Sequence, residues 1–201
     1  MINNDTLQLT ENDANLKMII SIISEPHVQS TNNVFHDLMS CILEQQIHYR
    51  STKKIFQKML NSASLGILTP ENFPQFEEKA FSGIKLSIGK YETVLKIIEF
   101  WDENKINWQK LNDDEVIEQL SSIKGIGKWT IDMILLYTLQ RKNVIPYDDF
   151  HLKEIMVRTY GLNPNIKLKA QMVDISTAWG EHKSLAVRYL LAWREFNKRK
   201  N

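Results

Sequence analysis

The sequence predicts an all-helical protein. Apolar residues recur at intervals of three and four along most of the 201-residue chain, which is the spacing of one helix face. No segment alternates apolar and polar residues with the period of two that is typical of a strand. Residues that favour helix starts and stops stand between the apolar stretches. These observations predict nine or ten helices and no sheet.

Four apolar stripes mark helices in the first half of the chain. They consist of Leu16, Ile19, Ile20 and Ile23; Phe35, Leu38, Met39, Ile42 and Leu43; Ile55, Phe56, Met59 and Leu60; and Tyr91, Val94, Leu95, Ile98 and Trp101. Ser87 precedes the fourth stripe and is a candidate N-cap. Thr69 is a second candidate N-cap, because Pro70 follows it and proline is favoured at the first helical position. We therefore expect a further helix that begins at Pro70.

The second half is expected to contain a helix, a tight glycine turn and a buried helix. The stripe Val116, Ile117, Leu120 and Ile123 leads into residues 124–128, Lys-Gly-Ile-Gly-Lys, and residues 129–139 are almost continuously apolar. Pro146 ends this region. Three more stripes follow, formed by Leu152, Ile155 and Met156; by Leu168, Met172, Ile175 and Trp179; and by Leu185, Tyr189, Leu190 and Trp193. Residues 194–201 are expected to form a frayed basic tail.

Composition indicates a globular protein with a substantial core. Hydrophobic residues make up 43% of the chain and charged residues 24%. With 25 Lys and Arg against 24 Asp and Glu, any affinity for nucleic acid must come from the arrangement of charge. The single cysteine, Cys41, excludes an intramolecular disulfide and a multi-cysteine metal site, which predicts a cytoplasmic protein and a core role for Cys41. The polar N-terminus and the absence of 18 consecutive apolar residues predict neither secretion nor a membrane span.

The glycine turn has a chemistry of its own. Gly125 and Gly127 flank Ile126, which we expect to anchor the turn. Without Cβ atoms, the backbone can turn sharply and bring its N–H groups against a phosphate, with Lys124 and Lys128 nearby. The structural alternative is a plain helix connection with a glycine C-cap.

Two longer motifs enclose this turn. Residues 120–130 read Leu-Ser-Ser-Ile-Lys-Gly-Ile-Gly-Lys-Trp-Thr, and after one apolar helix residues 144–152 read Val-Ile-Pro-Tyr-Asp-Asp-Phe-His-Leu. The pair closely resembles the signature of the helix-hairpin-helix DNA glycosylases, within which it is most similar to the 3-methyladenine DNA glycosylase II branch. Weaker similarity covers residues 42–48, residues 86–91, Trp179 and Lys183-Ser184, so the resemblance spans about residues 33–195.

The resemblance implies an all-α, two-lobed helix-hairpin-helix glycosylase fold within a single unit of residues 1–201. Residues 31–146 would form the lobe that carries the hairpin at 124–128, residues 1–30 with 147–201 would form the second lobe, and the active site would lie in the cleft between them. The implied activity is that of a monofunctional DNA glycosylase of base excision repair. It would flip alkylated purines of the 3-methyladenine and 7-methylguanine type out of double-stranded DNA and hydrolyse their N-glycosidic bonds, as a monomer.

The resemblance places the catalytic carboxylate at Asp149. Breaking the bond between C1′ and the base passes through an oxocarbenium-like state, which a nearby negative charge stabilises. A helix start would favour the ionised form of Asp149 through the helix dipole. An ordinary N-cap role is the alternative, and we expect Asp148 to take that role alone.

The resemblance also assigns a base pocket of Trp129, Met133, Phe150 and Leu191, with Tyr137 as a further candidate. Trp129 stands where bifunctional glycosylase-lyases of the superfamily carry a nucleophilic lysine, and indole cannot form a Schiff base. An aromatic wall would suit a cationic alkylated purine. Core packing is the alternative for Trp129, Met133 and Tyr137, and Leu191 occupies a position where the family usually has tryptophan.

Further roles follow from motif position. Gln46 or His48, with Gln45 as another candidate, would fill the gap that the flipped base leaves. The DNA-binding residues of the hairpin would be Lys124, Gly125, Ile126, Gly127, Lys128 and Thr130. His151, Arg158, Lys183 and Arg188 are either near DNA or ordinary surface residues. No cofactor is required for the chemistry, although the resemblance implies a structural Na⁺ or K⁺ held by the backbone carbonyls of Ser121, Ile123 and Ile126.

Two alternatives stay open from the sequence. The first is a related glycosylase for deaminated or oxidised bases, which the substituted pocket position at Leu191 permits. The second is a catalytically silent helix-hairpin-helix module, because a glycine hairpin suffices for DNA binding. The presence of Asp149 in an intact motif favours an enzyme.

Overall fold

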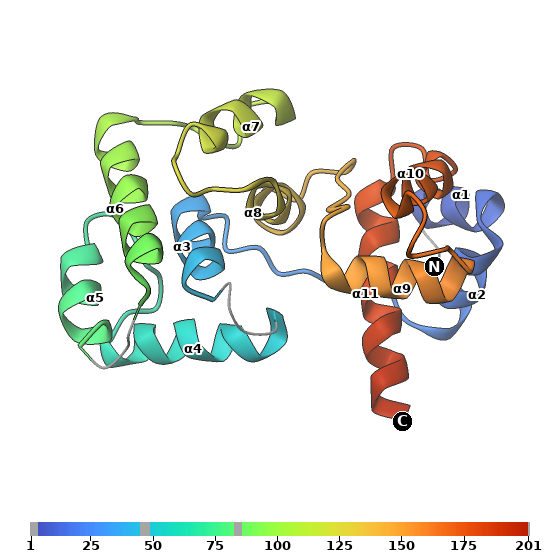
Figure 1. Ribbon diagram of the computed structural model, residues 1–201, viewed down its shortest axis with the longest axis horizontal. Coiled ribbons are helices and arrows are strands. Elements are labelled where there is room, and N and C mark those ends of the chain that lie inside the picture. The colour runs from blue at the N-terminus through green and yellow to red at the C-terminus, as the bar shows by residue number, and fades with distance from the viewer. Residues whose placement is uncertain (1–3, 45–48, 83–85, 201) are drawn as a thin grey trace. The chain divides into compact units, whose positions relative to one another are not determined.

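The computed structural model describes residues 4–44, 49–82 and 86–200, and over these ranges it contains helices and loops but no strand (Figure 1). The prediction of an all-helical fold is therefore confirmed. The predicted DNA-contacting residues Gln45, Gln46 and His48 lie outside the described residues.

The chain divides into two compact units. One comprises residues 30–139, and the other comprises residues 1–29 together with residues 140–201. The second boundary expected from the sequence follows residue 146, whereas these units separate after Leu139. The predicted active-site cleft between two lobes stays a prediction.

Helix α3, Val34–Glu44, is the centre of the unit formed by residues 30–139 (Figure 1). It packs against α4, Tyr49–Ser62; α6, Ile88–Glu103; α8, Lys128–Met133; and the π-helical segment η1, Ile134–Thr138. Helix α5, Phe73–Ala80, packs on α4, and α7, Asp113–Ser121, packs on α8. The apolar stripe of α3 is buried in this core, as its helical spacing predicts.

Helix α5 begins three residues later than the sequence predicts. The segment from Pro70 to Asn72 forms a turn instead, because the Asn72 side chain accepts from the Thr69 N–H at 2.8 Å and donates to the Ile67 carbonyl at 2.9 Å. The proline that starts the helix is Pro74, in its first turn. The expected helix start at Pro70 is therefore wrong.

The other unit contains α1, Asn4–Asn12; α2, Ala14–Ile22; α9, Phe150–Tyr160; α10, Leu168–Thr177; and α11, Lys183–Lys200. Helix α11 packs against α9 and α2, and α1 packs on α2. The described residues thus hold eleven α-helices and one π-helix, more than the nine or ten expected. Helix α1 could not be predicted from the sequence, because Leu9 is buried in that helix while Leu7 is exposed, which leaves no apolar stripe.

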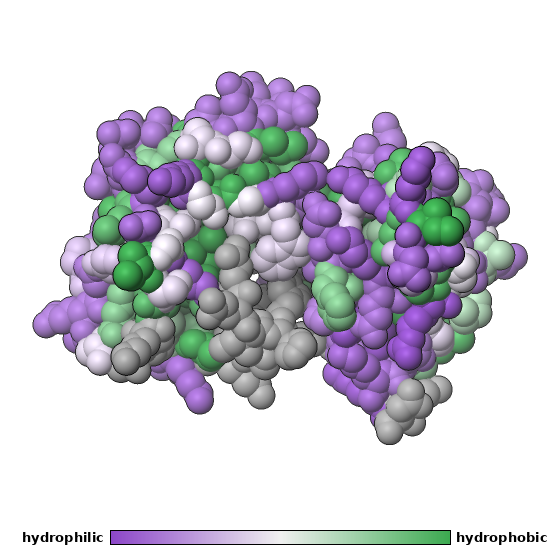
Figure 2. All heavy atoms as spheres, viewed as in Figure 1, coloured by the Kyte–Doolittle hydropathy of each residue, from purple (hydrophilic) through white to green (hydrophobic). Residues whose placement is uncertain are grey.

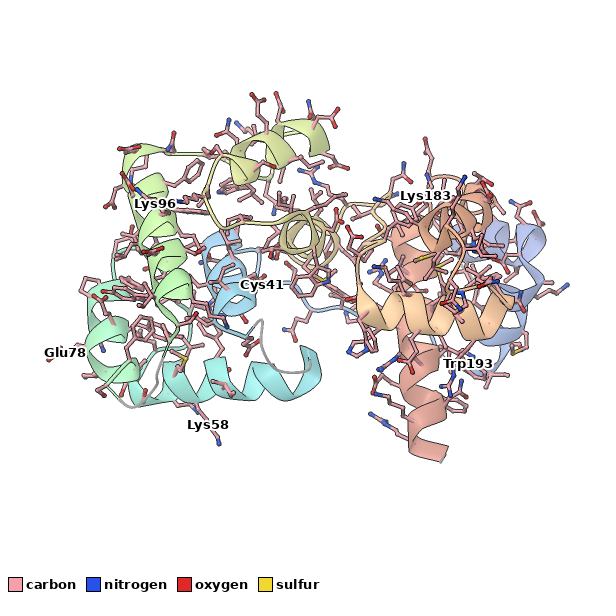
Figure 3. All side chains as sticks on the ribbon, viewed as in Figure 1. Cys41, Lys58, Glu78, Lys96, Lys183 and Trp193 are labelled. Carbon is pink, nitrogen blue, oxygen red and sulfur yellow. The ribbon has the colours of Figure 1, made fainter. Side chains whose placement is uncertain are left out.

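Helix α11 also corrects the expected frayed tail at residues 194–201. The helix continues to Lys200, and Arg194 is only 6% exposed. The Arg194 Nε donates to Glu154 Oε2 of α9 at 2.6 Å, and its Nη1 donates to Glu195 Oε1 at 2.9 Å. A long-range ion pair of this kind leaves no signal in the local apolar pattern. Lys183 and Trp193 mark the course of α11 in Figure 3.

A buried carboxylate joins three parts of this unit. Asp13 caps α2 through its Oδ1, which accepts from the N–H groups of Asn15 and Leu16 at 2.9 Å each. Its Oδ2 accepts from the Tyr160 hydroxyl at 2.7 Å and the Trp179 indole N–H at 2.8 Å. Burial, together with the hydrogen bond to Asp13, raises the pKa of Tyr160. These four hydrogen bonds tie the start of α2 to Tyr160 and Trp179.

We expect Tyr160→Phe to lower the free energy of unfolding by about 1.5–3 kcal/mol, because it removes a hydrogen bond to a charged group. Tyr147→Phe is the matched control, since the Tyr147 hydroxyl meets the neutral Ser176 hydroxyl at 2.9 Å and should contribute about 0.5–1.5 kcal/mol. Urea denaturation of both variants measures the difference. Equal losses would contradict a special role for the Asp13 carboxylate.

Candidate active site

The glycine hairpin forms as the sequence predicts. Helix α7 ends at Ser121, the Ile126 N–H donates to the Ile123 carbonyl at 3.1 Å, and α8 begins at Lys128 with Gly127 as its N-cap. Ile126 is buried and anchors the turn. The N–H groups of the first turn of α8 therefore follow directly on the turn, where they can meet an anion.

The two glycines of the hairpin serve different needs. Gly125 has φ +100°, a conformation that residues with a side chain rarely adopt, and a Cβ built there would lie 2.2 Å from Thr93 Oγ1 of α6. A Cβ built on Gly127 would meet no atom within 4 Å. Gly125 is therefore required by the fold, whereas the space beside Gly127 is open to a ligand.

The lysines and Thr130 differ in their access to DNA. Lys124 is exposed, while the Lys128 ammonium donates to both carboxylate oxygens of the buried Asp132, at 2.9 and 3.2 Å. The Lys128 side chain nevertheless stays more than half exposed. Thr130 is buried as a whole residue, and its predicted DNA contact stays a prediction.

The pocket candidates of this unit lie on α8 and η1. Trp129 is half-buried, and Tyr137 is also half-buried. Met133 is buried, which favours the alternative of core packing for that residue.

Asp149 lies at the start of α9. It is the N-cap of that helix, its Oδ1 accepts from the Leu152 N–H at 2.7 Å, and it is 8% exposed. This places the carboxylate at the positive end of the helix dipole, as predicted. The expectation that Asp148 alone takes the capping role is wrong, because Asp149 itself is the N-cap and α9 begins at Phe150. The Asp149 N–H donates to the Pro146 carbonyl, so Asp148 lies within the turn that precedes the helix. Asp148 is exposed and lies 3.7 Å from the Lys153 ammonium.

The segment before Asp149 is held by α11. The Ser184 hydroxyl accepts from the Val144 N–H at 2.9 Å, and the Ser184 N–H donates to the Lys142 carbonyl at 3.0 Å. Ser184 belongs to one of the weaker stretches of similarity, but its role as an anchor could not be read from the sequence because the contact spans forty residues.

The two residues that follow Asp149 in the sequence, Phe150 and His151, both carry rings. The Phe150 side chain is 70% exposed and contacts the His151 ring edge-on, with centroids 5.4 Å apart. Burial and the nearby Arg194 guanidinium lower the pKa of His151, while the Asp149 carboxylate acts in the opposite direction. Hydrophilic side chains otherwise cover much of the visible face of both units (Figure 2).

Comparisons with known proteins agree with these features. DNA-3-methyladenine glycosylase 1 of Schizosaccharomyces pombe is 24% identical over 192 residues, which cover 92% of this chain and 84% of that protein. The crystal structure of a DNA-3-methyladenine glycosidase from Bacillus halodurans superimposes with a TM-score of 0.80 at 23% identity, over 98% of this chain and 92% of that one. This chain is a homologue of the DNA-3-methyladenine glycosylases and has their helix-hairpin-helix fold.

A second solved structure with this fold contains nucleic acid. The 3-methyladenine DNA glycosylase of Schizosaccharomyces pombe in complex with abasic DNA superimposes with a TM-score of 0.78 at 23% identity, over 94% of this chain and 95% of that one. No family model matches the chain.

The monovalent cation that the glycosylase fold implies has suitable ligands in the hairpin. Ser121 ends α7, so its carbonyl is among those that lack a partner within the helix. The Ile123 carbonyl accepts one hydrogen bond, from the Ile126 N–H, and an oxygen of this type has two lone pairs. Together with the Ile126 carbonyl of the turn, these neutral oxygens at and after the C-terminus of α7 suit Na⁺ or K⁺. The described part of the chain contains no group of three or more His, Cys, Asp or Glu that could hold a metal ion.

The remaining candidates are distributed over the other unit of the glycosylase fold. Leu191, Lys183 and Arg188 are half-buried on α11, and Arg158 is exposed on α9 with its Nη1 3.9 Å from Glu154 Oε1. Asp149, Phe150 and His151 thus come from one unit, and the hairpin and Trp129 come from the other.

None of the described helices is both long and apolar enough to cross a membrane.

Proposed function

We propose that this protein is a monofunctional DNA glycosylase that hydrolyses the N-glycosidic bond of alkylated purines in double-stranded DNA. The observation that carries the proposal is the fixed carboxylate of Asp149, which caps α9 at the position where the family signature places its catalytic aspartate. The homologues named DNA-3-methyladenine glycosylase support the substrate class.

Asp149 supplies the negative charge that the reaction needs. As the bond between C1′ and the base breaks, positive charge develops on the sugar, and the Asp149 carboxylate stabilises it. A water molecule then adds to C1′ and loses a proton, which gives an abasic sugar and the free base. Because the Leu152 N–H fixes Oδ1, the carboxylate is oriented before the substrate binds.

A lyase step is not part of this proposal. A lyase needs an amine that attacks C1′, and Trp129 occupies the position where related lyases carry that lysine. The neighbouring Lys128 stands one position off around the helix, and its ammonium donates to both carboxylate oxygens of Asp132.

Alkylated purines suit the aromatic residues that the motifs assign to the base pocket. A purine alkylated at N3 or N7 carries a positive charge, so it leaves without protonation and no general acid is required. The half-buried Trp129 and the exposed Phe150 offer ring faces that attract such a cation. The hairpin holds a DNA phosphate through the N–H groups around Gly127, which positions the duplex without reading its sequence.

The test is to incubate the protein with methylated genomic DNA and identify the released bases by mass. We expect free 3-methyladenine and 7-methylguanine without prompt strand nicking. Duplexes that carry deaminated or oxidised bases serve as competing substrates, and faster release from them would transfer the proposal to that lesion class. Binding of duplex DNA without release of any base, or an adduct trapped by borohydride, would contradict hydrolysis.

A further inference from the structure

An arginine of α11 and a histidine of α9 face the same carboxylate oxygen. Arg194 is buried, and its Nε donates to Glu154 Oε2 at 2.6 Å. The His151 Nδ1 lies 4.0 Å from that oxygen. Two side chains that can carry a positive charge therefore meet one negative charge, and the chemistry proposed above makes use of neither.

Of these two contacts, the one with Arg194 is the strong one. A guanidinium that donates to a carboxylate at this distance forms a charge-assisted hydrogen bond, and it stays protonated at any pH at which proteins fold. At 4.0 Å, His151 is beyond hydrogen-bond distance from Glu154 and keeps only a weaker electrostatic attraction. Arg194 thus takes up most of the capacity of Glu154 to stabilise a cation.

His151 follows the proposed catalytic carboxylate by two residues, and the charges around it oppose each other. Burial and the Arg194 guanidinium lower the pKa of His151, and Lys198 of α11 adds to this effect. The carboxylates of Asp149 and Glu154 act in the opposite direction. The net effect is a pKa below the ordinary value of 6.5, so His151 is neutral at pH 7.

We propose that Arg194 is a positioning residue that keeps His151 uncharged in the first turn of α9, near the Asp149 carboxylate. A protonated His151 would be a second cation that competes with the developing sugar cation for Asp149. Arg194 opposes protonation by its own charge and by occupying Glu154. This inference rests on the proposed glycosylase function.

Substitutions on both sides of Glu154 test the inference. Arg194→Met removes the charge and keeps an apolar stem, Arg194→Lys keeps a charge, and Glu154→Gln removes the other partner of the same ion pair. Arg158→Met is the matched control, because Arg158 is exposed and its Nη1 lies 3.9 Å from the other oxygen of Glu154. Excision of one alkylated purine is measured at saturating enzyme, in single turnover, at pH 6 and pH 8. Each rate is divided by that of the native protein at the same pH.

We expect Arg194→Met to lower this relative rate about tenfold at pH 6 and less than about threefold at pH 8. The loss at pH 6 is part of the 10²–10³-fold that full removal of such electrostatic stabilisation costs. Adding His151→Gln should abolish the difference between the two pH values, because Arg194 acts through His151. Arg194→Lys and Arg158→Met should show no such difference.

Glu154→Gln separates this inference from a purely structural role of the ion pair. It leaves the Arg194 charge near His151, so it should lose no more activity at pH 6 than at pH 8. A structural role predicts that both partners of the pair lose activity alike at both pH values. An NMR titration of His151 in the native protein and in Glu154→Gln gives a second test, which does not require Arg194→Met to fold. His151 should be neutral at pH 7 in both proteins.

Three results would overturn the inference. They are equal losses of Arg194→Met at pH 6 and pH 8, acid sensitivity that persists after His151→Gln is added, and a charged His151 in the native protein at pH 7. Absence of base release by the native protein would instead contradict the proposed function.

Discussion

Asp149→Asn is expected to lower the single-turnover rate of base excision by about 10²–10³-fold, because it removes the charge that stabilises the developing oxocarbenium ion. The fold should be preserved. Asparagine caps a helix as well as aspartate does, and its side-chain oxygen can still accept from the Leu152 N–H. The thermal unfolding midpoint of the variant should therefore stay close to that of the native protein. Excision of methylated purines and thermal unfolding, measured on the same preparation, check both parts.

Asp148→Asn is the matched control for this prediction. Asp148 is the adjacent residue and has the same chemistry, but it is exposed, and its Oδ1 lies 3.7 Å from the Lys153 ammonium. Its loss should change the excision rate by less than about twofold, since exposed ion pairs contribute little. If Asp148→Asn were the inactive variant, the assignment of the carboxylate would be wrong.

Substitutions of the two hairpin glycines are expected to have opposite effects on stability and DNA binding. Gly125→Ala should lower the free energy of unfolding by about 2–4 kcal/mol, since it combines a disfavoured backbone conformation with a Cβ pressed against Thr93. Gly127→Ala should leave stability nearly unchanged, because its Cβ enters open space. That space is where the proposed phosphate approaches the backbone, so duplex affinity should fall about tenfold or more. Urea denaturation and fluorescence anisotropy measure the two quantities.

A double variant separates the two causes at Gly125. Thr93→Ala removes the Oγ1 and Cγ2 atoms that lie 2.2 and 2.9 Å from the added Cβ. Combined with Gly125→Ala, it should recover about 1 kcal/mol relative to the sum of the single changes. The backbone penalty at φ +100° should remain. Strict additivity of the two substitutions would contradict the steric contact, and native affinity of Gly127→Ala for DNA would contradict the phosphate contact.

The sequence predicted the parts of this protein that depend on local chemistry. The spacing of apolar residues predicted the helices that carry the site, and the hairpin turn formed with Ile126 buried at its centre. The motif placed Asp149 at a helix start, where the structure has it. Each of these features is encoded by residues only a few positions apart, so a pattern reveals them.

Features that depend on distant contacts could not be predicted in this way. The burial of Arg194 depends on Glu154 in another helix, and the requirement for Gly125 depends on Thr93 of α6. Which of Asp148 and Asp149 caps α9 depends on the exact residue at which the helix begins. Local sequence patterns do not fix a helix boundary to within one residue. The Lys90 ammonium donates to the Leu43 carbonyl, and this contact across forty-seven residues likewise leaves no trace in the local sequence.

The most direct test of a negative charge beside the sugar is the affinity for a charged analogue of the transition state. The measurement compares the affinities for two duplexes, one with a cationic pyrrolidine and one with a neutral tetrahydrofuran in place of the target sugar. The native protein should bind the cationic duplex at least about 10²-fold more tightly, and Asp149→Asn should lose most of that preference. Equal affinity of the native protein for the two duplexes, or a preference that Asp149→Asn retains in full, would contradict the catalytic role of Asp149.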